Sequence, residues 1–314
     1  MLTAAARPSW PAAVSPLVLG AVAGPRRAAR VLGVFPTCVY VGLGPHDAVL
    51  ALLARDALLQ PIGLRLPTWS PDVRWDVSPG DEVDVGEGRV RLARADVVAA
   101  RVQRLPRVAP PPPDQPPHRP LDCALDCTLD DTDCALHCAL DWPPEAQRWL
   151  AALAQDLAAA ALTNQPVAPF LRSLVGAGRG LTPSGDDAIA GVVLALRAAG
   201  RLRAVDRVGS HLGPLLDRTT SVSAALLRAA VEGYAVPEVV ALLAAPGPSP
   251  DPRLLERVLA IGHSSGRDLL AGITGARRAL SAHRAVGHRA VGHRAVGHRT
   301  GTVHASAQEG VLHA

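Results

Sequence analysis

The spacing of apolar residues changes partway along this 314-residue chain, and the change constrains the fold more than any other feature. Over residues 73–92, apolar and polar residues alternate and are interrupted by Ser-Pro-Gly-Asp and Gly-Glu-Gly, a pattern typical of antiparallel hairpins. From Glu145 onward, apolar residues such as Leu150, Leu153 and Leu157 recur at helical spacing. The sequence therefore predicts an α+β protein, with a β-rich N-terminal domain followed by an all-helical C-terminal domain. Further helices are predicted at 183–199, 221–232, 237–244, 252–261 and 265–282.

The same change, with two low-complexity stretches, divides the chain into five parts. Residues 110–113 are all proline, which neither a helix nor a central strand accepts, so this stretch belongs to a linker that continues into a Cys/Asp repeat. Near the end, His-Arg-Ala-Val-Gly repeats with a five-residue period that matches neither helix nor strand. We expect a poorly ordered N-terminus (1–30), a β-rich domain (31–105), a linker (106–144), a helical domain (145–282) and a disordered tail (283–314).

Composition argues against several classes of partner. The basic residues, all arginine, scatter along the chain for a formal net charge of only +4, and aromatic residues make up 3%. Nucleic-acid binding needs a clustered basic face and usually aromatic side chains for stacking, so we expect no nucleic-acid partner. No apolar run reaches the roughly 20 residues that cross a bilayer, and Pro16 interrupts the apolar stretch near the N-terminus. We therefore expect a cytoplasmic protein without a membrane partner.

The linker contains four cysteines spaced C-x3-C-x6-C-x3-C, at Cys123, Cys127, Cys134 and Cys138. Structural zinc sites usually use C-x2-C pairs, and the recurrence of Leu-Asp-Cys is typical of a slipped DNA repeat, so we expect no metal. A metal remains the alternative, because a spacing of four can place two thiolates on one helical turn. Without lysine there is no P-loop, and no glycine fingerprint follows a strand, so we expect no nucleotide cofactor.

The first candidate site is the glycine-rich segment 176–187, Gly-Ala-Gly-Arg-Gly-Leu-Thr-Pro-Ser-Gly-Asp-Asp. We expect it to open a helix with Thr182 or Ser184 as N-cap, and with Pro183 as the first helical residue after Thr182. A helix start attracts anions through its free N–H groups. Arg179 is a further candidate anion ligand. A capping box, Ser184-x-x-Asp187, is the alternative, but it leaves the glycines unexplained. The candidate substrate-binding residues here are Gly178, Gly180, Thr182, Ser184 and Gly185.

The second candidate site is the segment 262–268, Gly-His-Ser-Ser-Gly-Arg-Asp. It repeats the first at an offset of 81 residues, from Ser184 to Ser265, and both copies read S-G-x-D-x-x-A-G-x(5)-R. We infer an internal pseudo-repeat whose two helix N-termini surround one ligand. The substrate-binding candidates in this segment are Ser264, Ser265 and Gly266.

Two further features of the sequence have more than one interpretation. Gly262-x-Ser264-x-Gly266 matches the G-x-S-x-G pattern of serine hydrolases, but that pattern needs a preceding strand, and residues 253–261 are predicted to be helical. Thr219 and Thr220, before the predicted helix at 221–232, either cap that helix or hydrogen-bond the ligand.

Together these segments resemble a known family. Residues 178–187, 218–221 and 262–268 with Gly272 are similar to the family called domain of unknown function 2877, which includes one subunit of bacterial oxamate carbamoyltransferase. The resemblance covers roughly residues 14–280, with Arg179 where the family has proline and Ala188 where it has phenylalanine.

The resemblance implies a function. It points to a subunit of a carbamoyltransferase-like enzyme that acts on a small ureido or oxo acid, with other transferase subunits as partners. Carboxylates would hydrogen-bond the carbamoyl amide, and His263 would serve as donor or acid–base group. The alternative is a non-catalytic small-anion-binding or regulatory subunit. The candidate catalytic residues are Asp186, Asp187, His263 and Asp268.

Overall fold

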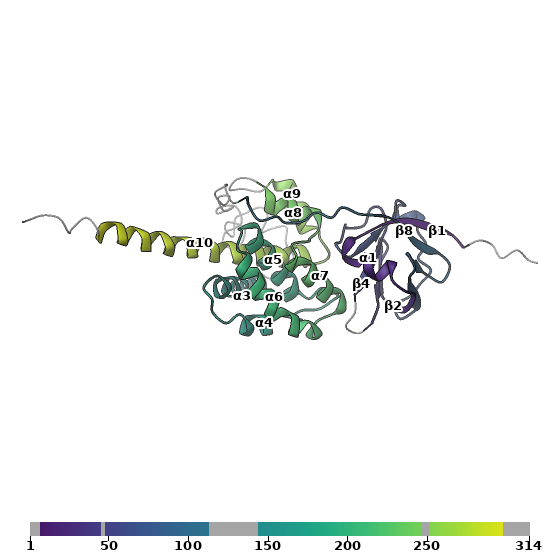
Figure 1. Ribbon diagram of the computed structural model, residues 1–314, viewed down its shortest axis with the longest axis horizontal. Coiled ribbons are helices and arrows are strands. Elements are labelled where there is room, and N and C mark those ends of the chain that lie inside the picture. The colour runs from purple at the N-terminus through teal and green to yellow at the C-terminus, as the bar shows by residue number, and fades with distance from the viewer. Residues whose placement is uncertain (1–6, 45–47, 113–143, 246–250, 298–314) are drawn as a thin grey trace, which may run out of the picture.

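The computed structural model describes residues 7–44, 48–112, 144–245 and 251–297. Figure 1 shows two units, a β-barrel from the first part of the chain and a group of packed helices from the second. The predicted α+β architecture is therefore confirmed. Within the part of the chain that the structure describes, no helix is both long and apolar enough to cross a membrane.

The N-terminal unit is a closed barrel with the strand order β1-β5-β4-β3-β2-β6-β7-β8. Most neighbouring strands are antiparallel, but β1 runs parallel to β8 and β4 runs parallel to β5. Buried Val, Leu and Ala side chains fill its interior. The strands are β1 (Ser9–Val14), β2 (Arg27–Val34), β3 (Cys38–Gly42), β4 (Val49–Leu53), β5 (Gly63–Arg65), β6 (Glu82–Gly86), β7 (Arg89–Arg91) and β8 (Asp96–Val102), with a 3-10 turn η1 (Ser70–Asp72).

The barrel begins earlier than the sequence predicted. Residues 9–30, expected to be poorly ordered, form β1, the helix α1 (Pro16–Ala23) and the start of β2. The buried Ser15 caps α1 by accepting a hydrogen bond from the Leu17 N–H at 3.1 Å. The order of this segment comes from its long-range pairing with β5 and β8, which local spacing does not reveal. The first six residues lie outside the described part.

The C-terminal unit is a set of helices in which α10 packs along both α3 and α5. Its core contains the large buried side chains of Leu157, Leu171, Ile189 and Leu196. The elements are α3 (Pro144–Leu162), α4 (Ala168–Leu174), α5 (Ser184–Ala198), α6 (Leu202–Leu212), the 3-10 helix η2 (Gly213–Arg218), α7 (Ser221–Val231), α8 (Pro237–Ala244), α9 (Pro252–Leu259) and α10 (Ser265–Gly297).

The expectation of a disordered tail is wrong for residues 283–297, which continue α10 (Figure 1). Extending a helix that is already anchored by packing is far easier than starting one, so the repeat needs no apolar face of its own. Residues 298–314 and the four linker cysteines, at positions 123, 127, 134 and 138, lie outside the described residues.

The two units touch through α7 and the loop before α5. Val222 and Ala225 of α7 belong to the apolar cluster of the barrel, and Leu181 packs against the same cluster. Beyond β8, the chain pairs with the helical unit, where the Val108 N–H donates to the Gly233 carbonyl at 2.8 Å. The loop 176–183 therefore lies where the barrel meets the helices.

Candidate functional site

The crossing of α5 and α10 brings the two predicted loops together. A Cβ atom on Gly191 of α5 would lie 2.2 Å from the Leu269 carbonyl oxygen of α10. One on Gly272 of α10 would lie 2.1 Å from the Ala188 carbonyl oxygen of α5. Neither separation is sterically allowed, so only glycine permits this approach at either position. These are equivalent positions of the sequence repeat, as an internal pseudo-repeat predicts.

The hydroxyl groups of the two loops meet directly. Thr182 Oγ1 and Ser265 Oγ are 2.9 Å apart, and both lie near the carboxyl group of Asp187. In the reciprocal arrangement, the hydroxyls of Ser184 and Ser264 lie near the carboxyl group of Asp268. Each aspartate thus faces a serine of the opposite copy, and the two helix starts form one cluster of two carboxyl and four hydroxyl groups.

Helix capping does not account for the hydroxyl groups of the first loop. Pro183 occupies the N-cap position of α5, with φ −56° and ψ 143°, and no side chain caps this helix start. The expectations that Thr182 or Ser184 caps α5, and that Pro183 is its first helical residue, are therefore wrong. Because the capping-box geometry is not formed, both hydroxyl groups are available to the shared cluster.

Burial dominates the electrostatics of the two carboxyl groups. It raises the pKa of Asp187 to about 8, assisted by the nearby charges of Asp268 and Asp186 and opposed by the hydroxyls of Ser265 and Thr182. Burial also raises the pKa of Asp268, which is 2% exposed. In the described residues, Oδ2 of each carboxyl group is buried and has no hydrogen-bond partner. At neutral pH the pair therefore retains a proton, and it offers both a donor and an acceptor.

Asp186, the third candidate carboxylate, is held by the protein itself. Its Oδ1 accepts from the Gly176 N–H at 2.9 Å, and its Oδ2 accepts from the Ser223 hydroxyl at 2.7 Å and from the Thr219 hydroxyl. These bonds tie the first loop to α7. Thr219 thus helps to hold Asp186 in place, and Asp186 in turn positions the first loop.

Thr220 joins the same framework as the N-cap of α7. Its hydroxyl accepts from the Ser223 N–H at 3.0 Å and donates to the Leu181 carbonyl. Of the two interpretations offered for Thr219 and Thr220, capping is confirmed for Thr220. Ser223 belongs to the same hydroxyl-rich segment, 218–223, but was not among the candidate site residues, because a serine three positions after an N-cap resembles ordinary helix-start chemistry.

Several candidate glycines shape the loops. Cβ atoms on Gly185 and Gly266 would lie 2.0 and 1.9 Å from the carbonyl oxygens of Leu174 and Val258, so each helix start lies directly against the end of the preceding helix. Gly178 has φ +125°, and a Cβ there would lie 2.6 Å from the Ser184 nitrogen. Exposed Gly180 has open space where a Cβ would lie, and its φ of +89° favours glycine where the chain turns.

The remaining candidates lie at the outer margin of the cluster. His263 and Arg179 are both exposed to solvent. The serine-hydrolase alternative is wrong, because the helix α9 precedes Ser264 where that fold requires a strand. Across the described ranges, no group of three His, Cys, Asp or Glu side chains is arranged to hold a metal ion.

Comparison with known proteins bears on this part of the chain. No solved structure matches it significantly. The model of the family described as oxamate carbamoyltransferase subunit AllH matches residues 174–277, a third of the chain. The match runs from the end of α4 into α10 and includes both loops, so the segment that builds the carboxyl–hydroxyl cluster is similar to an oxamate carbamoyltransferase subunit.

Proposed function

We propose that this protein is a subunit of a carbamoyltransferase-like enzyme acting on a small ureido or oxo acid of the oxamate or oxalurate type. The proposal also places the chain in the wider family called domain of unknown function 2877. The observation that carries it is the cluster at the start of α5 and α10, where Asp187 and Asp268 each have a buried Oδ2 without a partner among the described residues. The family similarity of residues 174–277 supports the choice of reaction.

The cluster suits a ligand with an amide next to a carboxylate. An ionised carboxyl group accepts hydrogen bonds from an amide NH2, whereas a protonated one donates to a carbonyl or carboxylate oxygen. The raised pKa of Asp187 provides the protonated form near neutral pH. The N-termini of α5 and α10 add a positive partial charge that favours an anion. Oxamate has an amide and a carboxylate on adjacent carbons. One molecule therefore matches the protonated carboxyl group, which donates, and the ionised one, which accepts, and it brings a negative charge to the N-termini of α5 and α10.

In the proposed transfer, the acceptor nitrogen attacks the carbonyl carbon of carbamoyl phosphate. A nitrogen–carbon bond forms, the carbon–oxygen bond to phosphate breaks, phosphate leaves, and the nitrogen gives up a proton. Asp187 or Asp268, whichever is ionised, receives that proton, and His263 at the margin is a further acid–base candidate. The phosphate must stay away from these carboxyl groups, because like charges repel strongly where water is excluded. Its positive partner comes from elsewhere in the chain or from another subunit.

A second candidate function involves the same ligand but no catalysis of carbamoyl transfer by this chain. In this alternative the protein is a non-catalytic subunit that binds a small anion and regulates a separate transferase. The exposed position of His263 favours this alternative, because proton transfer is more efficient at a site that excludes water. Both functions predict that the protein binds oxamate. They differ in whether carbamoyl transfer depends on Asp187.

The test compares binding with turnover in the protein purified together with the subunits that accompany it. Titration calorimetry measures oxamate binding, and formation of the N-carbamoyl product measures transfer. Asp187→Asn should weaken binding about tenfold or more, because the lost group leaves its partners unpaired. At saturating oxamate the variant should also lose transfer, while Asp156→Asn, on the exposed face of α3, should behave like the wild type. Transfer that persists at saturation would favour the regulatory function, and no binding of oxamate to the wild type would reject both.

A further inference from the structure

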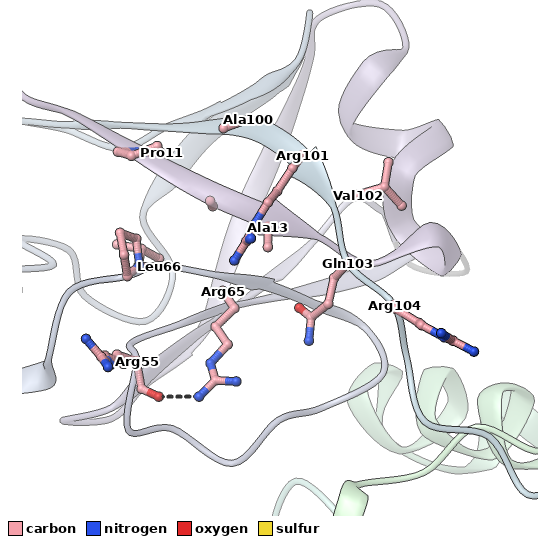
Figure 2. A pocket seen from close by; sticks show the side chains of 12 residues that line it. Pro11, Ala13, Arg55, Arg65, Leu66, Ala100, Arg101, Val102, Gln103 and Arg104 are labelled. Carbon is pink, nitrogen blue, oxygen red and sulfur yellow. Dashed lines mark hydrogen bonds between the residues drawn. The ribbon is translucent and has the colours of Figure 1, made fainter.

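The barrel has a hollow of its own, remote in sequence from the α5–α10 cluster. Its volume is about 540 Å³, within the roughly 300–1,000 Å³ of small-molecule sites. Every lining residue belongs to the first 104 positions, and none is acidic. Figure 2 shows the arginine side chains that line it. These arginines are Arg55, Arg65, Arg101 and Arg104, with Gln103 as a further polar lining residue.

The strand register places two of these arginines on either side of an alanine. Ala13 of β1 pairs with Arg65 of β5 on one side and with Arg101 of β8 on the other. Paired residues project from the same face of a sheet, and neighbouring strands lie about 4.8 Å apart, so the two arginine backbones are roughly 10 Å apart. The small side chain of Ala13 leaves a notch between them.

A β-bulge on β8 places Arg65, Ala13 and Arg101 side by side on one face of the sheet. Ala12 pairs with Ala99, whereas Ala13 pairs with Arg101, so Ala100 is the extra residue on β8. In a regular ladder Ala13 would face Ala100, and Arg101 would project from the opposite face. The bulge therefore brings Arg101 to the face that Arg65 occupies, and it places Ala100 at the wall of the hollow.

Among the residues that the structure describes, no ion pair joins an arginine of the hollow to an acidic side chain. In the described barrel, the ion pairs join other residues, such as Arg26 with Asp84 and Arg89 with Asp96. Arg65 instead donates to the Arg55 carbonyl at 2.7 Å, and the Arg55 guanidinium lies 5.0 Å from the centre of the Trp69 ring. These contacts orient two guanidinium groups without neutralising them, so the positive charge is available to an anion.

We propose that this hollow binds a small molecule carrying two or more phosphate or carboxylate groups. The planar fork of a guanidinium matches both groups through paired hydrogen bonds, and two forks separated by a notch suit two anionic groups on one ligand. The site is distinct from the α5–α10 cluster and does not depend on the function proposed for it.

The probes are pyrophosphate and citrate, titrated into the full-length protein at low salt by calorimetry. Arg65→Gln and Arg101→Gln should each weaken binding about tenfold or more, the loss expected when a charge-assisted hydrogen bond is removed. Ala13→Val should weaken binding comparably by filling the notch while every charge remains. The matched control is Arg94→Gln, which removes an exposed arginine of the same barrel outside the hollow.

Further measurements separate the proposal from simpler explanations. Thermal melts establish that each variant is folded, and Ala13→Val tests the hollow even where an arginine variant fails to fold. Asp187→Asn should bind the probes like the wild type. The proposal is overturned if neither probe binds, if Arg94→Gln weakens binding as much as Arg65→Gln, or if Asp187→Asn abolishes it.

Discussion

Asp186 and Asp187 are consecutive residues at the start of α5, yet their carboxyl groups have opposite surroundings. Asp186 accepts hydrogen bonds from Gly176, Thr219 and Ser223, whereas Asp187 Oδ2 is buried without a partner among the described residues. Successive side chains on a helix diverge by about 100°, so one carboxyl group faces α7 and the other faces α10. In the proposed function, Asp186 holds the first loop in place and Asp187 contacts the ligand, so the two positions serve as matched controls for each other.

Asp186→Asn should destabilise the fold by about 2 kcal/mol or more, since hydrogen bonds to a charged group contribute roughly 1.5–3 kcal/mol each. Ser223→Ala should add less destabilisation in the Asp186→Asn background than in the wild type, because the two residues share one network. Urea unfolding of the two single variants and the double variant measures this coupling. Strict additivity, or a stability for Asp186→Asn equal to that of Asp156→Asn, would contradict the role assigned to Asp186.

Asp187→Asn should change how stability depends on pH. The folded state raises the pKa of this carboxyl group from its ordinary 3.8 to about 8, so between these values the folded protein holds a proton that the unfolded chain has lost. That contribution to stability is complete below pH 3.8 and is lost as the pH rises to about 8. The variant should therefore gain stability relative to the wild type as the pH increases from about 5 to about 8. Unfolding curves across this range check it, with Asp156→Asn expected to run parallel to the wild type.

Much of the architecture was predictable because it follows from local patterns. Helical spacing identified α3, α5 and α7–α10, and alternation identified the β6–β7 hairpin. Closure of the barrel was not predictable in this way, because β1 is ordered by pairing with β5 and β8 far along the chain. The sequence did not indicate α4 or α6; α4 is short, with an apolar run too brief for a clear period.

The candidate site was predictable in part because the repeat is visible in the sequence. Matching Ser184 with Ser265 predicted that the loops meet, and the structure places the matched glycines Gly191 and Gly272 at the close crossing of α5 and α10. The different surroundings of Asp186 and Asp187 were not predictable, because they depend on where α7 packs. Residue preferences at helix starts also predicted the wrong position for Pro183, which the backbone geometry places at the N-cap.

The helix crossing gives a third prediction. Gly191→Ala and Gly272→Ala should each destabilise the protein by about 1–3 kcal/mol, the usual cost of adding a methylene to a packed interior. Gly20→Ala is the control, because this exposed helical glycine of α1 has open space around it and alanine should stabilise it by roughly 0.5–1 kcal/mol. Chemical denaturation measures all three. Equal effects at positions 20 and 191 would show that backbone propensity, and not the crossing, determines the result.

The last prediction tests whether the two loops hold one ligand. Asp187→Asn and Asp268→Asn should each keep the fold and weaken oxamate binding about tenfold or more, because each leaves ligand groups unpaired. If both carboxyl groups contact the same molecule, the double variant should lose less than the sum of the single losses, since groups that share a partner are not additive. Calorimetric titrations of the two single variants and the double variant, beside thermal melts, make the comparison. Arg94→Gln, an exposed position of the barrel outside the hollow, is the control for a charge change elsewhere and should leave oxamate binding unchanged. Additive losses would mean that the two loops bind separately, and losses that follow the melting temperatures would mean that the aspartates act only through folding.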